Sequence, residues 1–89
     1  MPLTISMYDP ERRIIEELQD PLITQSSVAL TYAFLMAQDT GGRANWPAIN
    51  AAIRQRWKGK TALERVKTMA WKHVDEWDRR WRAAAEAKA

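Results

Sequence analysis

Apolar residues recur along the chain with helical spacing and predict four helices. Trp46, Ile49, Ile53 and Trp57 are three, four and four residues apart, which places them on one side of a helix. A second series with the same kind of spacing predicts one narrow apolar stripe on a longer helix: Leu63, Val66, Ala70, Val74, Trp77 and Trp81. These patterns predict helices over residues 10–19, 25–38, 46–58 and 62–85.

Capping and breaking residues support these boundaries. Asp9 stands before Pro10, and proline suits the first position of a helix because its missing amide hydrogen costs nothing there. Gly59 is expected to end the third helix. Thr61 and Glu64 have the spacing of a capping box at the start of the fourth helix.

The second helix is expected to be the central one. Residues 25–38 leave almost no polar side, which is typical of a helix surrounded by others. The chain also has five tryptophans, which we expect to be the main anchors of the core. The predicted core includes Trp46, Ile53, Trp57, Val66 and Ala70. The predicted fold is therefore an all-α, compact bundle of about four helices, forming a single domain over all 89 residues.

Both ends of the chain are expected to differ from the bundle. Residues 1–8 are predicted to form an extended N-terminal arm, with alternating apolar residues at Leu3, Ile5 and Met7. The alanine-rich residues 83–89 are expected to fray. The tryptophans near the end of the fourth helix are predicted to lie beyond the shorter helices. Either the N-terminal arm or a second copy of the chain can cover them.

Composition narrows the possible functions. Hydrophobic residues make up 46% of the chain and charged residues 28%, as in ordinary globular proteins. There is no cysteine and His73 is the only histidine, so the sequence predicts neither a metal site nor a nucleophile with its base. We expect a non-catalytic protein with no cofactor and no small-molecule substrate. No signal peptide or membrane span is evident, which predicts a cytoplasmic protein.

Charge is distributed unevenly. Residues 1–43 hold three basic and six acidic residues, whereas residues 44–89 hold eleven and five. A basic half can bind DNA or another polyanion, or it can dock against the acidic half of its own chain. The candidate nucleic-acid-binding residues run from the end of the third helix into the fourth: Arg54, Arg56, Lys58, Lys60, Arg65, Lys67, Thr68 and Lys72.

Part of this segment resembles a known DNA-binding unit. Trp46 and Ile49, the basic turn over residues 58–61, and a following helix with Val66 and Trp71 are similar to the last two helices of a Myb-type or homeodomain-like helix-turn-helix. The resemblance covers residues 46–71. It implies that the helix after the turn reads DNA, with four of its residues at the groove: Arg65, Lys67, Thr68 and Lys72.

A second resemblance concerns the setting in which the protein works. Residues 46–53 followed by residues 62–71 are similar to segments of short proteins of tailed phages and prophages. The resemblance implies an accessory protein that binds DNA or a host protein. The alternative to DNA binding is therefore a protein-binding adaptor or inhibitor that uses an exposed tryptophan surface, with Trp71, Trp77 and Trp81 as candidate interface residues.

Overall fold

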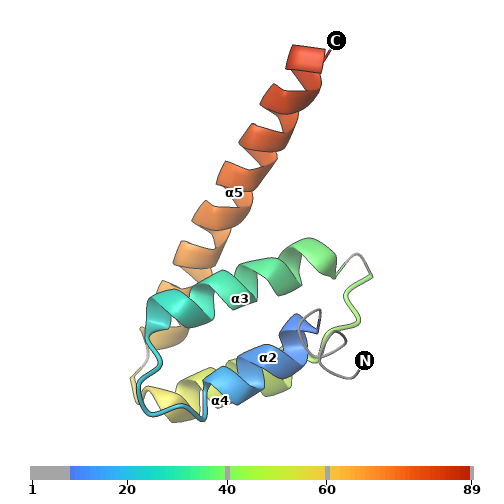
Figure 1. Ribbon diagram of the computed structural model, residues 1–89. Helices are drawn as coiled ribbons and strands as arrows, with labels where there is room; N and C mark the ends of the chain where they lie inside the picture. The colour runs from blue at the N-terminus through green and yellow to red at the C-terminus, as the bar shows by residue number, and fades with distance from the viewer. Residues whose placement is uncertain (1–8, 40, 60, 89) are drawn as a thin grey trace.

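The computed structural model describes residues 9–39, 41–59 and 61–88, and the prediction of an all-α bundle is confirmed (Figure 1). Its helices are α2 (Pro10–Glu17), α3 (Gln25–Gln38), α4 (Trp46–Arg56) and α5 (Ala62–Lys88). Each begins at the predicted residue. α3 ends at the predicted residue, α2 and α4 end two residues early, and α5 continues three residues further. The predicted N-terminal arm lies outside the described residues.

Side-chain caps explain why the helices begin where they do. The Asp9 carboxylate accepts a hydrogen bond of 3.2 Å from the backbone amide of Arg12, and Pro10 occupies the first turn of α2. The Thr24 hydroxyl accepts from the backbone amide of Ser27 at the start of α3. Asn45 caps α4 in the same way. Each cap satisfies an amide that the first turn leaves free.

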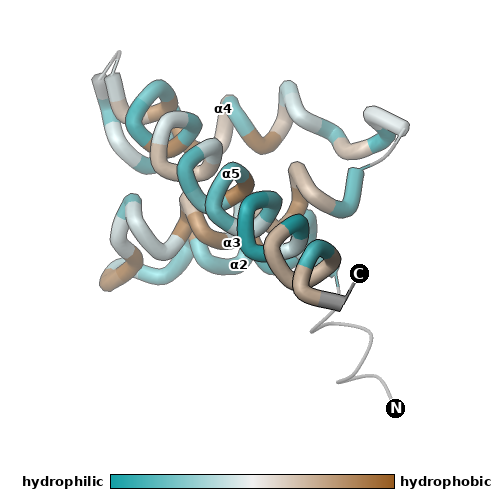
Figure 2. Tube along the Cα trace, turned by 90° about the horizontal axis from the view of Figure 1, so that it is seen from above, coloured by the Kyte–Doolittle hydropathy of each residue, from teal (hydrophilic) through white to brown (hydrophobic). Residues whose placement is uncertain are grey.

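Each of the four helices packs against two others. α3 lies against α2 and α5, while α4 lies against α5 and α2. Seen from above, α5 runs between α4 on one side and the α2 and α3 pair on the other (Figure 2). The prediction that α3 is surrounded by other helices is wrong for its outer side. There Leu30 is 40% exposed and Phe34 is 48% exposed.

The core consists mainly of aliphatic side chains. The largest fully buried ones are Ile14, Val28, Ile49, Ile53 and Val66. Among the residues that the structure describes, Tyr32 is the one aromatic residue in this buried cluster. Branched aliphatic side chains therefore fill much of the space between the helices.

The predicted core is correct for Ile53, Val66 and Ala70, which are fully buried. It is wrong for the tryptophans as main anchors, because Trp46 and Trp57 are only partly buried and pack against the edge of the core. Trp57 follows the last residue of α4 and has an extended backbone, so it leaves the helical stripe. A helical periodicity cannot be extended past the end of its helix.

The C-terminal half of α5 leaves the other helices and projects from the bundle (Figure 1). Residues 78–87 are all exposed, so the prediction that the last tryptophans lie beyond the shorter helices is correct for Trp81. It is wrong for Trp77, which is partly buried and stacks on Phe34 of α3. No helix in the described parts of the chain is long and apolar enough to cross a membrane.

Candidate nucleic-acid interface and aromatic strip

The basic segment begins at the end of α4 and continues through the turn into α5. Arg54 and Lys58 are exposed there. Gly59 has a φ of 152°, a backbone conformation that favours glycine, and it turns the chain towards α5. Lys60 lies outside the described residues. In the sequence, Lys58 and Lys60 flank Gly59. Residues with a side chain rarely adopt the backbone conformation of Gly59.

On α5, three of the four predicted groove residues share one side of the helix. Arg65, Thr68 and Lys72 are all exposed. Arg65 and Lys72 lie within about 20° of each other around the helix axis, because seven residues make nearly two turns. Lys67 lies about 160° from Arg65 and is partly buried, so it faces elsewhere. Helix geometry thus separates Lys67 from the other three.

Arg56 is held by contacts within the protein. Its guanidinium donates hydrogen bonds to the backbone carbonyls of Asp20 and Pro21, at 3.4 and 3.1 Å. It also lies 5.2 Å from the ring centroid of Trp57, within the range of a cation–π contact. These contacts tie the end of α4 to the turn between α2 and α3. They leave Arg56 less free for a ligand than Arg54 or Lys58.

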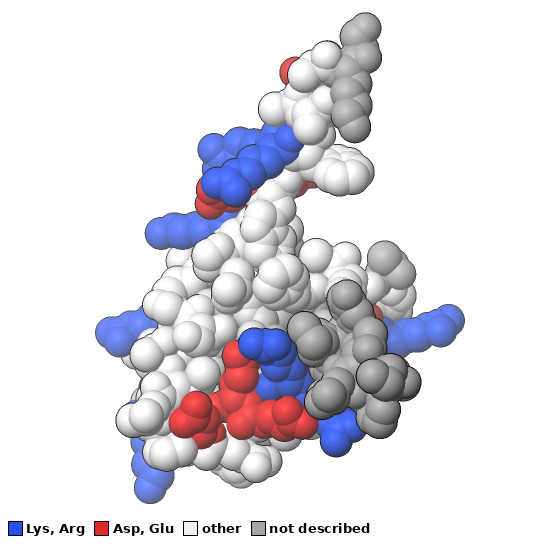
Figure 3. Space-filling model, viewed as in Figure 1, with Lys and Arg blue, Asp and Glu red and all other residues white. Residues whose placement is uncertain are grey.

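Ion pairs neutralise other parts of the surface. Within the described residues all ion pairs join residues four apart on one helix: Arg12–Glu16, Arg13–Glu17, Arg80–Glu76 and Arg82–Asp78. Figure 3 shows the acidic side chains of this face gathered with basic ones over α2 and again on the projecting part of α5. No ion pair among these residues joins the acidic half of the chain to the basic half. The cations at 54, 58, 65, 67 and 72 have no carboxylate partner in this part of the chain.

A second surface is aromatic. Trp77 stacks on Phe34 with ring centroids 4.9 Å apart, and it also stacks on His73 at 5.9 Å. Trp81 is 80% exposed one turn further along α5. We call Leu30, Phe34, Trp77 and Trp81 the aromatic strip. Residues 25–38 contain no charged side chain, so the strip continues onto an uncharged helix.

Trp71 does not belong to this strip. It is 56% exposed, but it lies about 120° from Trp77 around the helix axis. The three predicted interface tryptophans therefore occupy two separate surfaces. Sequence reasoning missed Phe34 and Leu30, which were assigned to a surrounded helix, although the absence of charge on residues 25–38 is a signal for an apolar contact surface.

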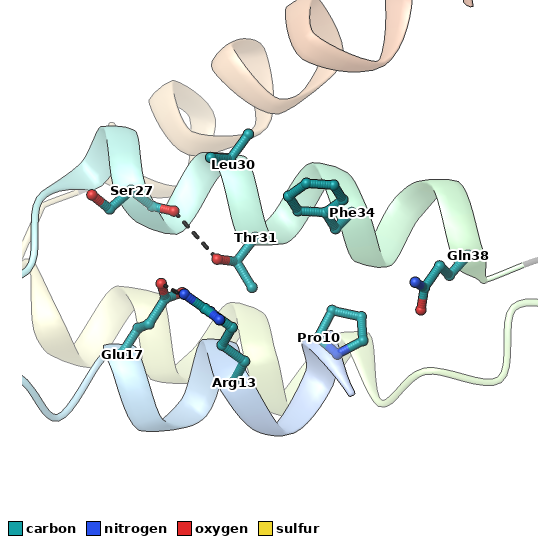
Figure 4. A pocket seen from close by; sticks show the side chains of 8 residues that line it. All are labelled: Pro10, Arg13, Glu17, Ser27, Leu30, Thr31, Phe34 and Gln38. Carbon is teal, nitrogen blue, oxygen red and sulfur yellow. Dashed lines mark hydrogen bonds and ion pairs between the residues drawn. The ribbon is translucent and has the colours of Figure 1, made fainter. Parts of the chain in front are cut away.

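A groove between α2 and α3 borders the strip (Figure 4). Leu30 and Phe34 of α3 line one wall, and Pro10 lines the other wall together with the ion-paired Arg13 and Glu17 of α2. Among the described residues no group of three or more His, Cys, Asp or Glu side chains can hold a metal ion. The groove thus combines apolar and charged side chains.

Comparison with family models, with curated proteins and with solved structures finds no match to this chain.

Proposed function

We propose that this chain is a small, non-catalytic accessory protein that binds the phosphate backbone of DNA. The contact surface is the turn between α4 and α5 together with the exposed side of α5. One observation carries this proposal. Between residues 54 and 72 the chain holds seven basic residues and one acidic residue, and the described cations in this segment have no carboxylate partner.

Phosphate contacts need charges that are free and accessible, and the geometry supports this for Arg54, Lys58, Arg65 and Lys72, which are all exposed. Thr68 adds a hydroxyl on the same side of α5. Its oxygen donates a 2.8 Å hydrogen bond to the Glu64 carbonyl and can still accept one. The resemblance of residues 46–71 to a helix-turn-helix unit supports the same surface, with α5 as the helix nearest to DNA.

The test is a salt titration of binding to a labelled DNA duplex. The wild-type protein is expected to bind at low salt, with an affinity that falls steeply as salt rises, since phosphate contacts release counterions. A variant with Arg54, Lys58, Lys60 and Arg65 replaced by glutamine is expected to bind more weakly and with a shallower salt dependence. No binding at low salt, or an affinity that ignores salt, contradicts the proposal.

A second candidate function is supported by the aromatic strip. Trp81 and Phe34 expose large apolar areas beside an uncharged helix, and such patches are typical of contacts with another protein. We propose this adaptor or inhibitor role as the alternative to DNA binding. Its test is affinity capture from a host lysate with and without nuclease. Capture that survives nuclease and is lost in Trp81→Ser, but not in Trp71→Ser, supports the alternative.

A further inference from the structure

One tryptophan of the basic segment is not accounted for by packing within the described part of the chain. Trp71 is 56% exposed, and it is not among the residues that pack against the core. Trp46 and Trp77 each contact another aromatic ring, whereas no ring of a described residue stacks on Trp71. A large part of its indole is therefore free to contact a ligand.

Trp71 lies between two cations that form no ion pair with the described residues. Lys67 is one turn before Trp71 and about 40° away from it around the helix axis. Lys72 is the next residue, about 100° away in the other direction. An aromatic side chain with a free cation on either side matches a nucleotide strand, in which phosphate groups flank each flat base.

Single-stranded DNA offers this combination of groups in an accessible form, and duplex DNA does not. The bases of a duplex are stacked on one another, so a side chain reaches the face of a base only after that base has been extruded, at a cost in unstacking. In a single strand the faces are accessible, and every base can stack on an aromatic side chain. The exposed indole of Trp71 therefore suits an unpaired base.

We propose that Trp71 stacks on one unpaired base of single-stranded DNA, while Lys67 and Lys72 contact the phosphates on either side of that base. The proposal rests on the DNA-binding function above and identifies a form of DNA that this part of α5 binds. It also gives Lys67 a ligand, although Lys67 points away from the side of α5 that carries Arg65.

Two carboxylates limit the path of the strand. Asp75 lies one turn after Trp71 and about 40° away around the axis, and Glu64 lies two turns before it and about 20° away. Both are exposed, so they repel a phosphate backbone that runs along α5 over Trp71. The strand is therefore expected to cross the helix, from the side of Lys67 to the side of Lys72, with one base on the indole.

The test compares variants on two probes, an oligo(dT) of about 15 nucleotides and a duplex of the same length, by fluorescence anisotropy at low salt. Trp71→Ala is expected to weaken binding to the oligo(dT) by about 5- to 150-fold, the effect of losing one stacked base. Its affinity for the duplex is expected to stay unchanged. Trp81→Ala is the matched control, because Trp81 is 80% exposed but lies outside the basic segment, and it is expected to leave both affinities unchanged.

Other substitutions at position 71 separate stacking from simple apolar contact. Trp71→Tyr keeps a ring that can stack and is expected to retain most of the affinity for the oligo(dT). Trp71→Leu keeps an apolar side chain without a flat face and is expected to bind as weakly as Trp71→Ala. In the wild type the oligo(dT) is expected to quench part of the tryptophan fluorescence. This quenching should disappear in Trp71→Tyr although the oligo(dT) still binds, and thermal melts should show that the variants remain folded.

The charged neighbours of Trp71 give a second test. Lys67→Gln is expected to lower the slope of log affinity against log salt by about 0.7 on the oligo(dT), since one phosphate contact is lost. The slope on the duplex is expected to stay the same, because Lys67 contacts a phosphate only in the single-stranded complex. Asp75→Asn is expected to strengthen binding to the oligo(dT) more than binding to the duplex, since it removes a repulsive charge one turn from the stacked base.

Two kinds of result overturn the proposal, and they are distinguishable. If the oligo(dT) binds but Trp71→Ala weakens it no more than Trp81→Ala does, or weakens both probes by the same factor, Trp71 does not stack on an unpaired base and the DNA-binding function stands. If the wild type binds neither probe at low salt, the DNA-binding function itself fails and the stacking fails with it.

Discussion

The indole Nε1 of Trp46 donates a 2.8 Å hydrogen bond to Oδ2 of Asp39, and this bond fixes the entry of α4 into the bundle. The other oxygen of the same carboxylate accepts from the backbone amides of Arg43 and Ala44, at 2.8 and 3.2 Å. One side chain at the end of α3 therefore holds both the loop and the first residue of α4. Trp46 acts as a hydrogen-bonded clamp at the edge of the core.

These hydrogen bonds to the Asp39 carboxylate predict that the folded protein loses stability in acid. The hydrogen bond from Trp46, followed by those from the two backbone amides, lowers the pKa of Asp39 below its ordinary value of 3.8. A carboxyl whose pKa is lowered by folding stabilises the protein above its unfolded pKa, and that stabilisation is lost as the pH falls through the folded value. The wild type is therefore expected to lose stability progressively below about pH 4.

Asp39→Asn removes the charge and keeps the shape of the side chain. We expect a lower melting temperature than wild type at pH 7, with the difference narrowing towards pH 2, because the wild type then also lacks the carboxylate. Asp75→Asn is the control, since Asp75 is exposed and makes no hydrogen bond or ion pair with the described residues. Thermal melts across this range give the answer, and a difference that stays constant with pH contradicts the prediction.

The buried phenol of Tyr32 predicts that the protein also loses stability at alkaline pH. The Tyr32 hydroxyl donates a 2.9 Å hydrogen bond to Oδ1 of Asn50 and so joins α3 to α4. Burial, and secondly the charge of Glu64, raise the pKa of Tyr32 above 10.0. The protonated phenol is thus favoured by folding. Its contribution is complete below the unfolded pKa and is lost as the pH rises through the folded one.

Tyr32→Phe is expected to cost about 1 kcal/mol at neutral pH, because Asn50 loses a partly buried partner. The variant should also lack the part of the alkaline loss that Tyr32 causes, so the two stabilities approach each other above about pH 10. Urea denaturation at neutral and alkaline pH measures both effects. An unchanged difference between the two proteins at high pH would show that folding does not raise the pKa of Tyr32.

The buried aliphatic residues predict the order of stability changes in the core. Ile53 is fully buried, and Ile53→Ala is expected to cost about 2 to 5 kcal/mol. Trp57 is only partly buried at the end of α4, so Trp57→Ala is expected to cost less, about 2 kcal/mol. Urea denaturation of the two variants tests this order. A larger loss for Trp57→Ala than for Ile53→Ala would show that Trp57 is a main contributor to the stability of the core.

The sequence predicts helices well here because their signals are local. Asp9 with Pro10 acts within a few residues of the helix start that it determines. Burial depends on where neighbouring helices end, which no local pattern contains. Val66 and Trp81 lie on one stripe, but α3 covers only the first part of it, so one is fully buried and the other is 80% exposed.

Long-range contacts are likewise hidden from the sequence. Arg56 was grouped with the free cations of its segment, yet it bonds carbonyls 35 and 36 residues earlier in the chain. The resemblance to a helix-turn-helix grouped Lys67 with Arg65, although side chains two positions apart on a helix point about 160° away from each other. Helix geometry alone would have separated these two residues. The contact of Arg56 required the packed structure.

The separation of Lys67 from Arg65 allows a test of whether DNA contacts one particular side of α5. Arg65→Gln, Lys72→Gln removes two charges from the exposed side that we propose for phosphate contact. Arg43→Gln, Lys67→Gln removes two charges elsewhere and is matched in net charge.

If two phosphate contacts are lost, the slope of log affinity against log salt should fall by about 2 in the first variant and by less than about 1 in the second. Fluorescence anisotropy on one duplex at several salt concentrations measures both slopes, and thermal melts show that both variants remain folded. Equal losses in the two variants would mean that net charge alone attracts DNA, because a defined contact surface distinguishes residues on it from residues of the same charge beside it.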